Sequence, residues 1–350
     1  HVFTIVNFAM LFAKESVPPA KRLPPPRESI FNSYYAFAGL DLTRLLHNAI
    51  KSFMRKKLTR KNKIIIATCL IAAALILVLV GGYVAFRRGL IRLPAKLYLH
   101  EENIGGDMIT LTLDEISDEY PQIEINQALL LVNEEHRLDE DFVADLVYYK
   151  DTDVLMNSCI VDSYATLSAE ILDIFDNKLF VESSYRTYQR QVELYEELGP
   201  EIAAVPGSSE HQTGLSLDVY VMYYGGMGFY DSDEGQFVNR NCGDYGFIIR
   251  YDRNLEDITG FAFEPWHIRY VGLPHSQIIE QSGIALEQYI EALEIGQYYS
   301  YDNYLIGRFE ANEILIPTEY LDAALENEDY TITISPDNTG AAIVTIRLPA

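Results

Sequence analysis

The longest uninterrupted apolar stretch lies in the first quarter of the sequence. Over residues 64–86, 23 consecutive residues (IIIATCLIAAALILVLVGGYVAF) carry no charge. A helix rises by about 1.5 Å per residue, so this length crosses a hydrocarbon core of about 30 Å. The run is longer than a signal-peptide core, and it ends in Arg87 and Arg88 instead of a small-residue cleavage site. It predicts one transmembrane helix.

Basic side chains flank this predicted helix unequally. Seven lie just before it, over residues 51–63, and four just after it, over residues 87–96. The more basic side of a membrane span stays in the cytoplasm. We therefore expect residues 1–63, a basic and proline-containing tail, to be cytoplasmic and the rest of the chain to face outward.

After residue 96 the pattern changes to short elements of mixed period. Residues 126–149 show mixed helical spacing, and residues 161–176 show it more clearly, with Leu167, Ile171 and Ile174 on one face. Residues 186–198 predict another helix, Pro206 and Gly207 a turn, and residues 178–184, 215–223 and 245–251 strands. Strands and helices without a repeating βαβ period predict an α+β fold with a central antiparallel sheet.

The pattern also suggests domain limits. Residues 87–125 form a juxtamembrane connector with one weak strand (MITLTL), and residues 126–290 form the main domain. Residues 291–350 form a C-terminal extension, in which two alternating runs flank a PDNTG turn and predict a β-hairpin.

Charge separates the two sides of the predicted membrane helix. Residues 1–96 hold 16 basic and 3 acidic side chains, a net charge of +13, whereas the remaining residues hold 11 basic and 48 acidic ones, a net charge of −37. Such an acidic domain repels nucleic acid, so a nucleic-acid partner is not expected. A peptide, glycan or small-molecule partner remains.

The first candidate site spans residues 209–218 (SEHQTGLSLD). It places His211 in a turn and Asp218 in the following strand, where alternation puts Asp218 on the polar face and Leu217 on the apolar face. Taken alone, a carboxylate in that position is usually only solvated or hydrogen-bonded.

The second candidate site is the segment EPWH, residues 264–267. Pro265 disfavours a helix, so Glu264 and His267 share a turn and not the helical pairing of the HExxH metalloproteases. Two histidines and one aspartate make a three-ligand nitrogen and oxygen set that suits catalytic zinc and leaves a position for water. Zinc lowers the pKa of bound water to about 7, so a neighbouring Glu264 can act as its base.

These segments resemble the motifs of the VanY-type D-alanyl-D-alanine carboxypeptidases. SSEHQTGLSLD is similar to their SxHxxGxxxD motif, FEPWHIRYVG to their ExxH motif, and SSYRTYQRQ to their S-x-Y-R-S segment. ALLLVNEEHRLDEDFVADLV is similar to their N-terminal helix region, so the resemblance spans about residues 126–272. Two departures are mild, since Thr187 replaces the usual serine and Ser216 stands where a small apolar residue is common.

The resemblance implies a role for each matching residue. It implies that one zinc ion is bound by His211, Asp218 and His267 and that Glu264 is the catalytic base. It also implies three substrate-binding residues: Arg186, which would hold the terminal carboxylate, and Gln191 and Ser209, which would line the site. Arg186 also fits on chemical grounds, because a guanidinium pairs with a terminal carboxylate through two hydrogen bonds. The plain alternative is a surface arginine at a helix end.

We therefore expect a zinc-dependent D,D-carboxypeptidase that removes the terminal D-Ala of peptidoglycan stem peptides. It would be a single-pass protein of the cell membrane, with its catalytic domain outside a Gram-positive cell. One alternative is an L,D-carboxypeptidase that acts on tetrapeptide stems, and another is a non-catalytic, zinc-bearing wall-binding module. An endopeptidase fits less well with a carboxylate-binding Arg186.

The other reactive side chains receive structural interpretations. We expect His136 to be structural, His100 and His275 to lie on the surface, and Arg269 to pair with acidic neighbours. Cys159 and Cys242 either form a disulfide or remain isolated buried thiols. Aromatic residues beside the motifs are expected in the core, with Trp266 the exception that lines the cleft.

Overall fold

The computed structural model describes residues 97–349, together with Thr59, Thr68, Cys69 and Ile76. The tail over residues 1–63 and the apolar run over residues 64–86 otherwise lie outside the described residues. Among the described residues, no helix is both long enough and apolar enough to cross a bilayer. The membrane helix therefore stays a prediction.

The middle of the described chain, residues 146–292, forms a first layer around a four-stranded antiparallel sheet. Its strands are, in spatial order, β6 (Phe180–Ser183), β7 (Ser216–Tyr220), β9 (His267–Tyr270) and β8 (Phe247–Ile249). A short hairpin, β4 (Leu146–Tyr148) and β5 (Leu155–Asn157), lies outside this sheet. The expected α+β class and antiparallel sheet are confirmed, as are the strands placed over residues 178–184, 215–223 and 245–251.

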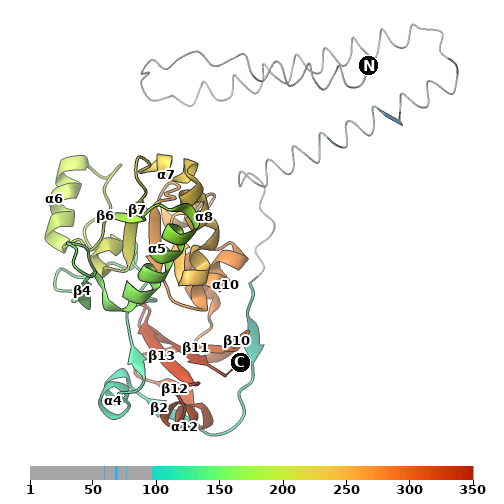
Figure 1. Ribbon diagram of the computed structural model, residues 1–350. Coiled ribbons are helices and arrows are strands. Elements are labelled where there is room, and N and C mark those ends of the chain that lie inside the picture. Colours follow the sequence, from blue (N-terminus) through green and yellow to red (C-terminus); the bar gives the residue numbers. More distant parts are fainter. Residues whose placement is uncertain (1–58, 60–67, 70–75, 77–96, 350) are drawn as a thin grey trace. The chain divides into compact units, whose positions relative to one another are not determined.

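Helices surround this sheet (Figure 1). They are α5 (Val161–Phe175), α6 (Tyr188–Leu198), α7 (Met227–Asp231), α8 (Asp233–Asn241), α9 (Glu256–Thr259), α10 (His275–Ser282) and α11 (Leu286–Ala292). Helix α5 packs Leu167 and Ile171 into one core with Leu217 and Val219 of β7, because alternation turns those two strand residues to the same face. Ile174, expected on the buried face of this helix, is exposed instead.

The two ends of the described chain build a second layer together. The strand order of its six-stranded sheet is β1 (His100–Glu102), β10 (Gln297–Tyr301), β11 (Tyr304–Glu310), β14 (Ala341–Arg347), β13 (Thr331–Pro336) and β3 (Glu124–Ile125). Strand β2 (Met108–Leu111) pairs with β12 (Ile314–Pro317), beside helices α4 (Leu113–Glu119) and α12 (Thr318–Glu326) (Figure 1). The predicted hairpin is confirmed as β13 and β14.

This pairing corrects the assignment of residues 87–125 to a connector, as far as the described residues 97–125 are concerned. They belong to the same layer as residues 297–347, because β1, β2 and β3 each pair with a C-terminal strand. Sequence periodicity cannot reveal a pairing between strands that lie about two hundred residues apart. The extension over residues 291–350 is likewise a sheet and not merely a hairpin.

A continuous apolar core joins the two layers. Val271 and Ile279, from the first layer, pack in one cluster with Ile306 and Ile343 of the second layer. Strand β14 is buried on both faces, since Ile343 faces this shared core while Val344 and Ile346 face the core under α4 and α12. The two layers are therefore held together by hydrophobic burial.

The segment Ala128–Val132, here called the strap, is not the helix that the spacing suggested. All five of its residues are buried, and no described helix lies between residues 126 and 145. Its backbone is bound from the neighbouring layer, with the N–H of Leu129 donating to Ser335 Oγ at 2.9 Å and that of Leu131 to the Asp337 carbonyl at 3.1 Å. Burial on all sides explains why its apolar run shows no clean period.

Candidate active site

The residues of the first motif are positioned by a turn and the strand that follows it. A short 3₁₀ helix, Glu210–Thr213, carries His211, and Gly214 ends it with a φ of 69°. A side chain at Gly214 would lie 2.8 Å from the backbone nitrogen of Asn157, so glycine is needed for both conformation and space. Strand β7 then starts and carries Asp218.

The second motif forms the tight turn that Pro265 indicated. The backbone N–H of His267 donates to the Glu264 carbonyl at 3.1 Å, and β9 begins at His267. In the register of β7 and β9, His267 lies directly opposite Asp218. Directly opposite side chains project to the same face of a sheet, so the two motifs meet there.

The three expected metal ligands lie together. One potential ligand atom from each of His211, Asp218 and His267 lies within 4.8 Å of the other two. Asp218 Oδ1 is 3.0 Å from Nδ1 of His267, and Asp218 Oδ2 is 3.3 Å from Nε2 of His211. Both histidines are buried, whereas Asp218 is partly exposed to the cleft.

The surroundings of the two imidazoles suit a metal. Nδ1 of His211 lies 2.8 Å from the Ser184 carbonyl, which can only accept, so Nδ1 carries the proton and Nε2 turns a lone pair toward Asp218. Nε2 of His267 is buried and makes no hydrogen bond within the part of the chain that the structure describes; Glu210 Oε2 lies 3.5 Å away. On the other side of the ring, Nδ1 of His267 converges with Nε2 of His211 and the Asp218 carboxylate, and these donors fit the ligand set of catalytic zinc.

The electrostatics of the cluster favour a cation. Burial alone would raise the pKa of Asp218, but the neighbouring imidazoles of His211 and His267 hold that pKa far below its usual range. Burial alone would lower the pKa of His267, but the hydrogen bond to Asp218 and the nearby Glu210 carboxylate raise it to about 9. Burial lowers the pKa of His211. A metal ion would replace the proton that His267 otherwise retains between two carboxylates.

Glu264 lies beside the cluster. Its Oε2 is 4.0 Å from Nδ1 of His267, and its backbone N–H is fixed by a 2.9 Å hydrogen bond to the Tyr251 carbonyl. Burial raises the pKa of this carboxyl, and the Asp218 charge raises it further, while His267 opposes the shift. A raised carboxyl pKa moves a general base toward neutral pH.

The expected substrate residues line the same cleft, which has a volume of about 280 Å³. Arg186 lines the cleft just before α6, whose first turn is capped by the Thr187 hydroxyl. The backbone N–H of Arg186 donates to the His211 carbonyl at 3.0 Å. Its guanidinium donates to Gln191 Oε1 at 2.9 Å and to Ser183 Oγ at 3.0 Å. Ser209 also lines the cleft, as does Trp266, in agreement with its expected position.

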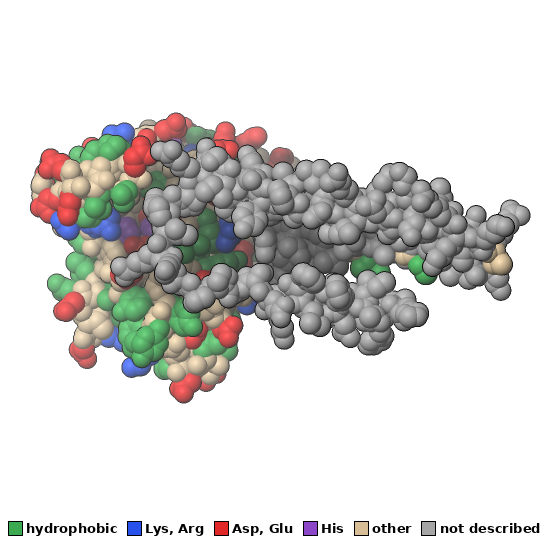
Figure 2. All heavy atoms as spheres, turned by 90° about the horizontal axis from the view of Figure 1, so that it is seen from above, with side chains coloured by type: hydrophobic (Ala, Val, Ile, Leu, Met, Phe, Trp, Pro, Cys, Tyr) green, Lys and Arg blue, Asp and Glu red, His purple; other side chains and the backbone are tan. Residues whose placement is uncertain are grey.

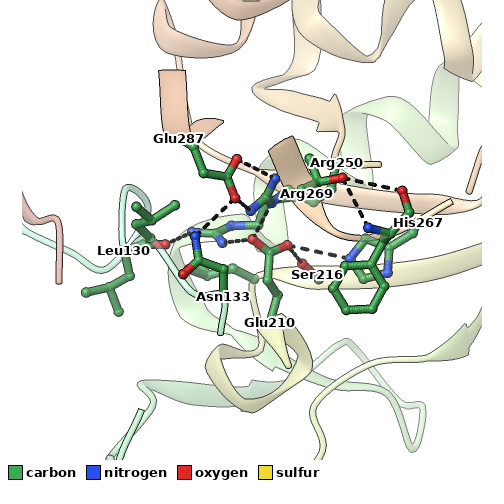
Figure 3. A network of polar contacts seen from close by, with 12 residues as sticks. Leu130, Asn133, Glu210, Ser216, Arg250, His267, Arg269 and Glu287 are labelled. Atoms are coloured by element: carbon green, nitrogen blue, oxygen red, sulfur yellow. Dashed lines mark hydrogen bonds and ion pairs between the residues drawn. The ribbon is translucent and has the colours of Figure 1, made fainter. Parts of the chain in front are cut away.

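Sequence reasoning predicted an acidic partner for Arg269 but missed the charge network that it joins behind the cluster, here called the rear network: Glu210, Arg250 and Arg269, which are buried, and Glu287, which is partly buried. Glu210 Oε1 accepts from Arg250 Nε and Arg269 Nη1, both at 2.7 Å (Figure 3). Burial would raise the pKa of Glu210, but Arg269 and Arg250 hold it well below its usual range. For Glu210 itself, the only signal in the sequence was its position between Ser209 and His211.

The other sequence expectations have mixed outcomes. Arg269 pairs with an acidic residue, as expected, and His100 is exposed. His275 is not on the surface but buried, 2.6 Å from the Tyr289 hydroxyl and 2.9 Å from Thr345 Oγ1. Both cysteines of the acidic part, Cys159 and Cys242, are free thiols.

The outer face of the first layer is acidic around a hollow. Figure 2 shows Asp and Glu side chains scattered over this face and histidine side chains at the bottom of a hollow in it. Some Lys and Arg side chains lie beside the hollow in this view. The cationic Arg186 is therefore a local exception within a domain of strongly negative charge.

Comparison with known proteins gives consistent matches. Residues 155–273 match the family model VanY, D-alanyl-D-alanine carboxypeptidase. The chain is 36% identical over 179 residues to a D-alanyl-D-alanine carboxypeptidase of Enterococcus faecium (47% of this chain, 58% of that protein). It is 33% identical over 185 residues to the putative carboxypeptidase YodJ of Bacillus subtilis (47% of this chain, 68% of that protein). The chain thus spans only part of the length of these relatives.

A solved structure extends the likeness beyond the motifs. The vancomycin resistance D,D-dipeptidase VanXYg, in complex with a D-Ala-D-Ala phosphinate analog, superposes with a TM-score of 0.56 at 28% identity. The superposition covers 69% of this chain and 98% of that one. This share is larger than residues 155–273 alone can supply.

Proposed function

Because the chain belongs to the VanY family of D-alanyl-D-alanine carboxypeptidases, we propose that it is a zinc-dependent D,D-carboxypeptidase. Its substrate would be a peptidoglycan stem peptide, from which it removes the terminal D-Ala. The observation that carries this proposal is that one cleft contains three potential metal ligands, the Glu264 carboxyl with its raised pKa, and the Arg186 guanidinium. Together these groups supply the parts of a metal-assisted exopeptidase.

The proposed metal site consists of His211, Asp218 and His267. When bound there, a zinc ion supplies a Lewis acid for the scissile carbonyl and lowers the pKa of a water molecule to about 7. Glu264 takes the proton of the attacking water and returns a proton to the amine of the departing D-Ala. Its position 4.0 Å from His267 Nδ1 keeps it beside the metal site without making it a fourth ligand.

Arg186 is proposed to bind the terminal carboxylate of the substrate. Its guanidinium is held by Gln191 and Ser183 on the wall of the cleft, so its position is fixed before the substrate arrives. A preorganised guanidinium binds a carboxylate with defined geometry. A peptide substrate can make this contact only if the residue after the scissile bond carries a free C-terminal carboxylate. Cleavage is therefore restricted to the last residue of the peptide.

The location of the enzyme follows from the sequence and is proposed on that basis. Residues 64–86 would anchor the chain in the cell membrane, with residues 1–63 in the cytoplasm and the catalytic domain outside. A substrate in the cell wall agrees with this orientation. Protease accessibility of the two sides in intact cells would test it.

The direct test offers pentapeptide and tetrapeptide stems to the purified protein, with and without a chelator. We expect loss of one D-Ala from the pentapeptide, inhibition by the chelator, and recovery on addition of zinc. Cleavage of the tetrapeptide alone would instead make the protein an L,D-carboxypeptidase. Zinc binding without cleavage of either stem would favour a wall-binding module.

A pentapeptide with an amidated C-terminus is the matched control for the role of Arg186. It keeps the scissile bond but removes the charge that Arg186 is proposed to bind. We expect its kcat/KM to fall for the wild-type enzyme and to change little for Arg186→Ala. Equal cleavage of both peptides by the wild type would contradict the carboxylate contact.

A further inference from the structure

The two nitrogens of the His267 ring have different surroundings. Nδ1 lies 3.0 Å from Asp218 Oδ1, on the side where His211 and Asp218 meet. Nε2 points away from them, is buried, and has Glu210 Oε2 at 3.5 Å. A neutral imidazole carries one proton, so the group that takes this proton decides which nitrogen can bind a metal.

The two oxygens of Glu210 also have different partners. Oε1 accepts from both Arg250 and Arg269 at 2.7 Å, and these contacts fix the carboxylate in place. Oε2 accepts from the Ser216 hydroxyl at 2.9 Å and faces His267 (Figure 3). With Oε1 occupied by two donors, Oε2 is left to receive the imidazole proton.

The arginines in turn are held by partners that do not touch His267. Arg250 binds both oxygens of Glu287, at 2.9 and 2.5 Å. Arg269 donates to the carbonyls of Ala128 and Leu130 in the strap, at 3.0 and 2.7 Å. Glu210 is therefore immobilised from two directions, which limits how far its Oε2 can move relative to the ring.

We propose that Glu210 is a positioning residue, which holds the Nε2 proton of His267 and so directs its Nδ1 lone pair to the metal. This inference rests on the proposed zinc site. It adds Glu210 to the functional residues already named, which are the three metal ligands and Glu264. A carboxylate behind a ligating histidine orients the ring and makes it a better donor, and loss of such a partner weakens metal binding by about 10–100-fold.

A purely structural role is the competing explanation, since Glu210 also neutralises two buried guanidinium groups. Glu210→Gln and Glu287→Gln separate the two roles. Both substitutions remove one negative charge from the rear network, but only the side chain at position 210 faces His267. Because the arginines are donors, the new amide oxygen at that position must stay with them, and its NH₂ group then points toward Nε2. That NH₂ favours a lone pair on Nε2 and a proton on Nδ1, which blocks the metal-binding nitrogen.

The experiment measures zinc affinity of the full chain, purified in detergent, by competition with a chelator, and thermal unfolding of the same samples. We expect Glu210→Gln to weaken zinc binding by about 10–100-fold. Glu287→Gln should lower the melting temperature but keep the wild-type zinc affinity. Equal loss of affinity in both variants, or wild-type affinity in Glu210→Gln, would overturn the proposal. A wild-type protein that binds no zinc would instead refute the proposed function.

A second measurement keeps the proposal testable if Glu210→Gln does not fold. In the zinc-loaded wild type, ¹⁵N NMR of the imidazole should show the His267 proton on Nε2, and Ser216→Ala should shift this signal because it removes a donor from the accepting oxygen. Alanine at this position removes one hydroxyl and no charge. A proton on Nδ1, or a signal that does not respond to Ser216→Ala, would show that Glu210 does not position the ring.

Discussion

The six-stranded and the four-stranded sheet both place buried side chains on two faces, but they use the second face differently. In the six-stranded sheet, β14 has apolar neighbours on both sides, with Val344 in one core and Ile343 in another. In the four-stranded sheet, Leu217 and Ile268 fill a core on one face. The opposite face carries the pairs Asp218–His267 and Ser216–Arg269, which are polar or charged.

This difference shows what a functional face requires. Apolar packing needs only shape, and it stabilises in proportion to the area that it buries. Buried charges need a partner for every donor and acceptor, because an unpaired one is costly. The four-stranded sheet meets that need with the rear network, in which Arg250 binds Glu210 and Glu287. The following predictions test whether the two faces can be disturbed independently.

The largest effect is expected at the functional face. Glu264→Gln should lower kcat by about 10²–10⁴-fold, because the general base is lost. Zinc affinity should stay near the wild-type value, since Glu264 is not among the three ligands. Stopped assays with pentapeptide stems and a chelator competition measure the two quantities. Near-normal turnover with zinc bound would rule out Glu264 as the base.

The second effect is a loss of stability, with or without a loss of zinc affinity. Ile334→Ala, in the fully buried core of the six-stranded sheet, should lower the free energy of unfolding by about 2–5 kcal/mol. Zinc affinity should be unaffected. Leu217→Ala, in the sheet that carries the site, should cost a similar amount but also weaken zinc binding, because it loosens the strand that holds Asp218. Urea unfolding and zinc titration of both variants decide the matter, and zinc loss in Ile334→Ala would break the comparison.

The third effect is a pH dependence of opposite sign at two histidines. In the metal-free protein, the pKa of His267 is raised to about 9. Protonated His267 therefore contributes up to about 3 kcal/mol to the free energy of unfolding. This contribution is complete below pH 6.5 and is lost as the pH rises through 9. Burial lowers the pKa of His275 to about 3, so its contribution is lost as pH falls below 6.5. Urea unfolding with chelator at pH 5 to 10 measures both.

His267→Gln is the control for the alkaline limb of that profile. It should flatten the loss of stability above pH 6.5 and leave the acid limb unchanged. Added zinc should reverse the alkaline trend, because metal binding displaces the His267 proton and strengthens as pH rises. An alkaline limb that persists in His267→Gln would assign it to another group.

The smallest effect is expected where the two layers meet. Thr345→Val removes the hydroxyl that lies 2.9 Å from His275 Nε2 but keeps the shape of the side chain. We expect a loss of about 1 kcal/mol in the free energy of unfolding. Turnover and zinc affinity should not change. A fall in turnover without a fall in stability would mean that the second layer acts on the site through this contact.

Local patterns predicted the elements and the front of the site. Alternation placed Asp218 on the polar face, and Pro265 indicated the turn that brings Glu264 beside His267. Of the rear network, only the acidic pairing of Arg269 could be predicted. Arg250 pairs with Glu210 across forty positions, and in the sequence it looks like the end of an ordinary strand. The strap was misread because its apolar run is buried by contacts from both layers, which erase its period.

The strap also limits how far this protein can be truncated without loss of its fold. A fragment limited to residues 155–273 would keep Arg250 and Arg269 but lose Glu287 and the carbonyls of Ala128 and Leu130. Breaking a buried ion pair costs about 3–5 kcal/mol, out of a total stability of about 5–15 kcal/mol for a typical protein. The stretch that carries the chemistry is therefore shorter than the shortest stretch that can be expected to fold.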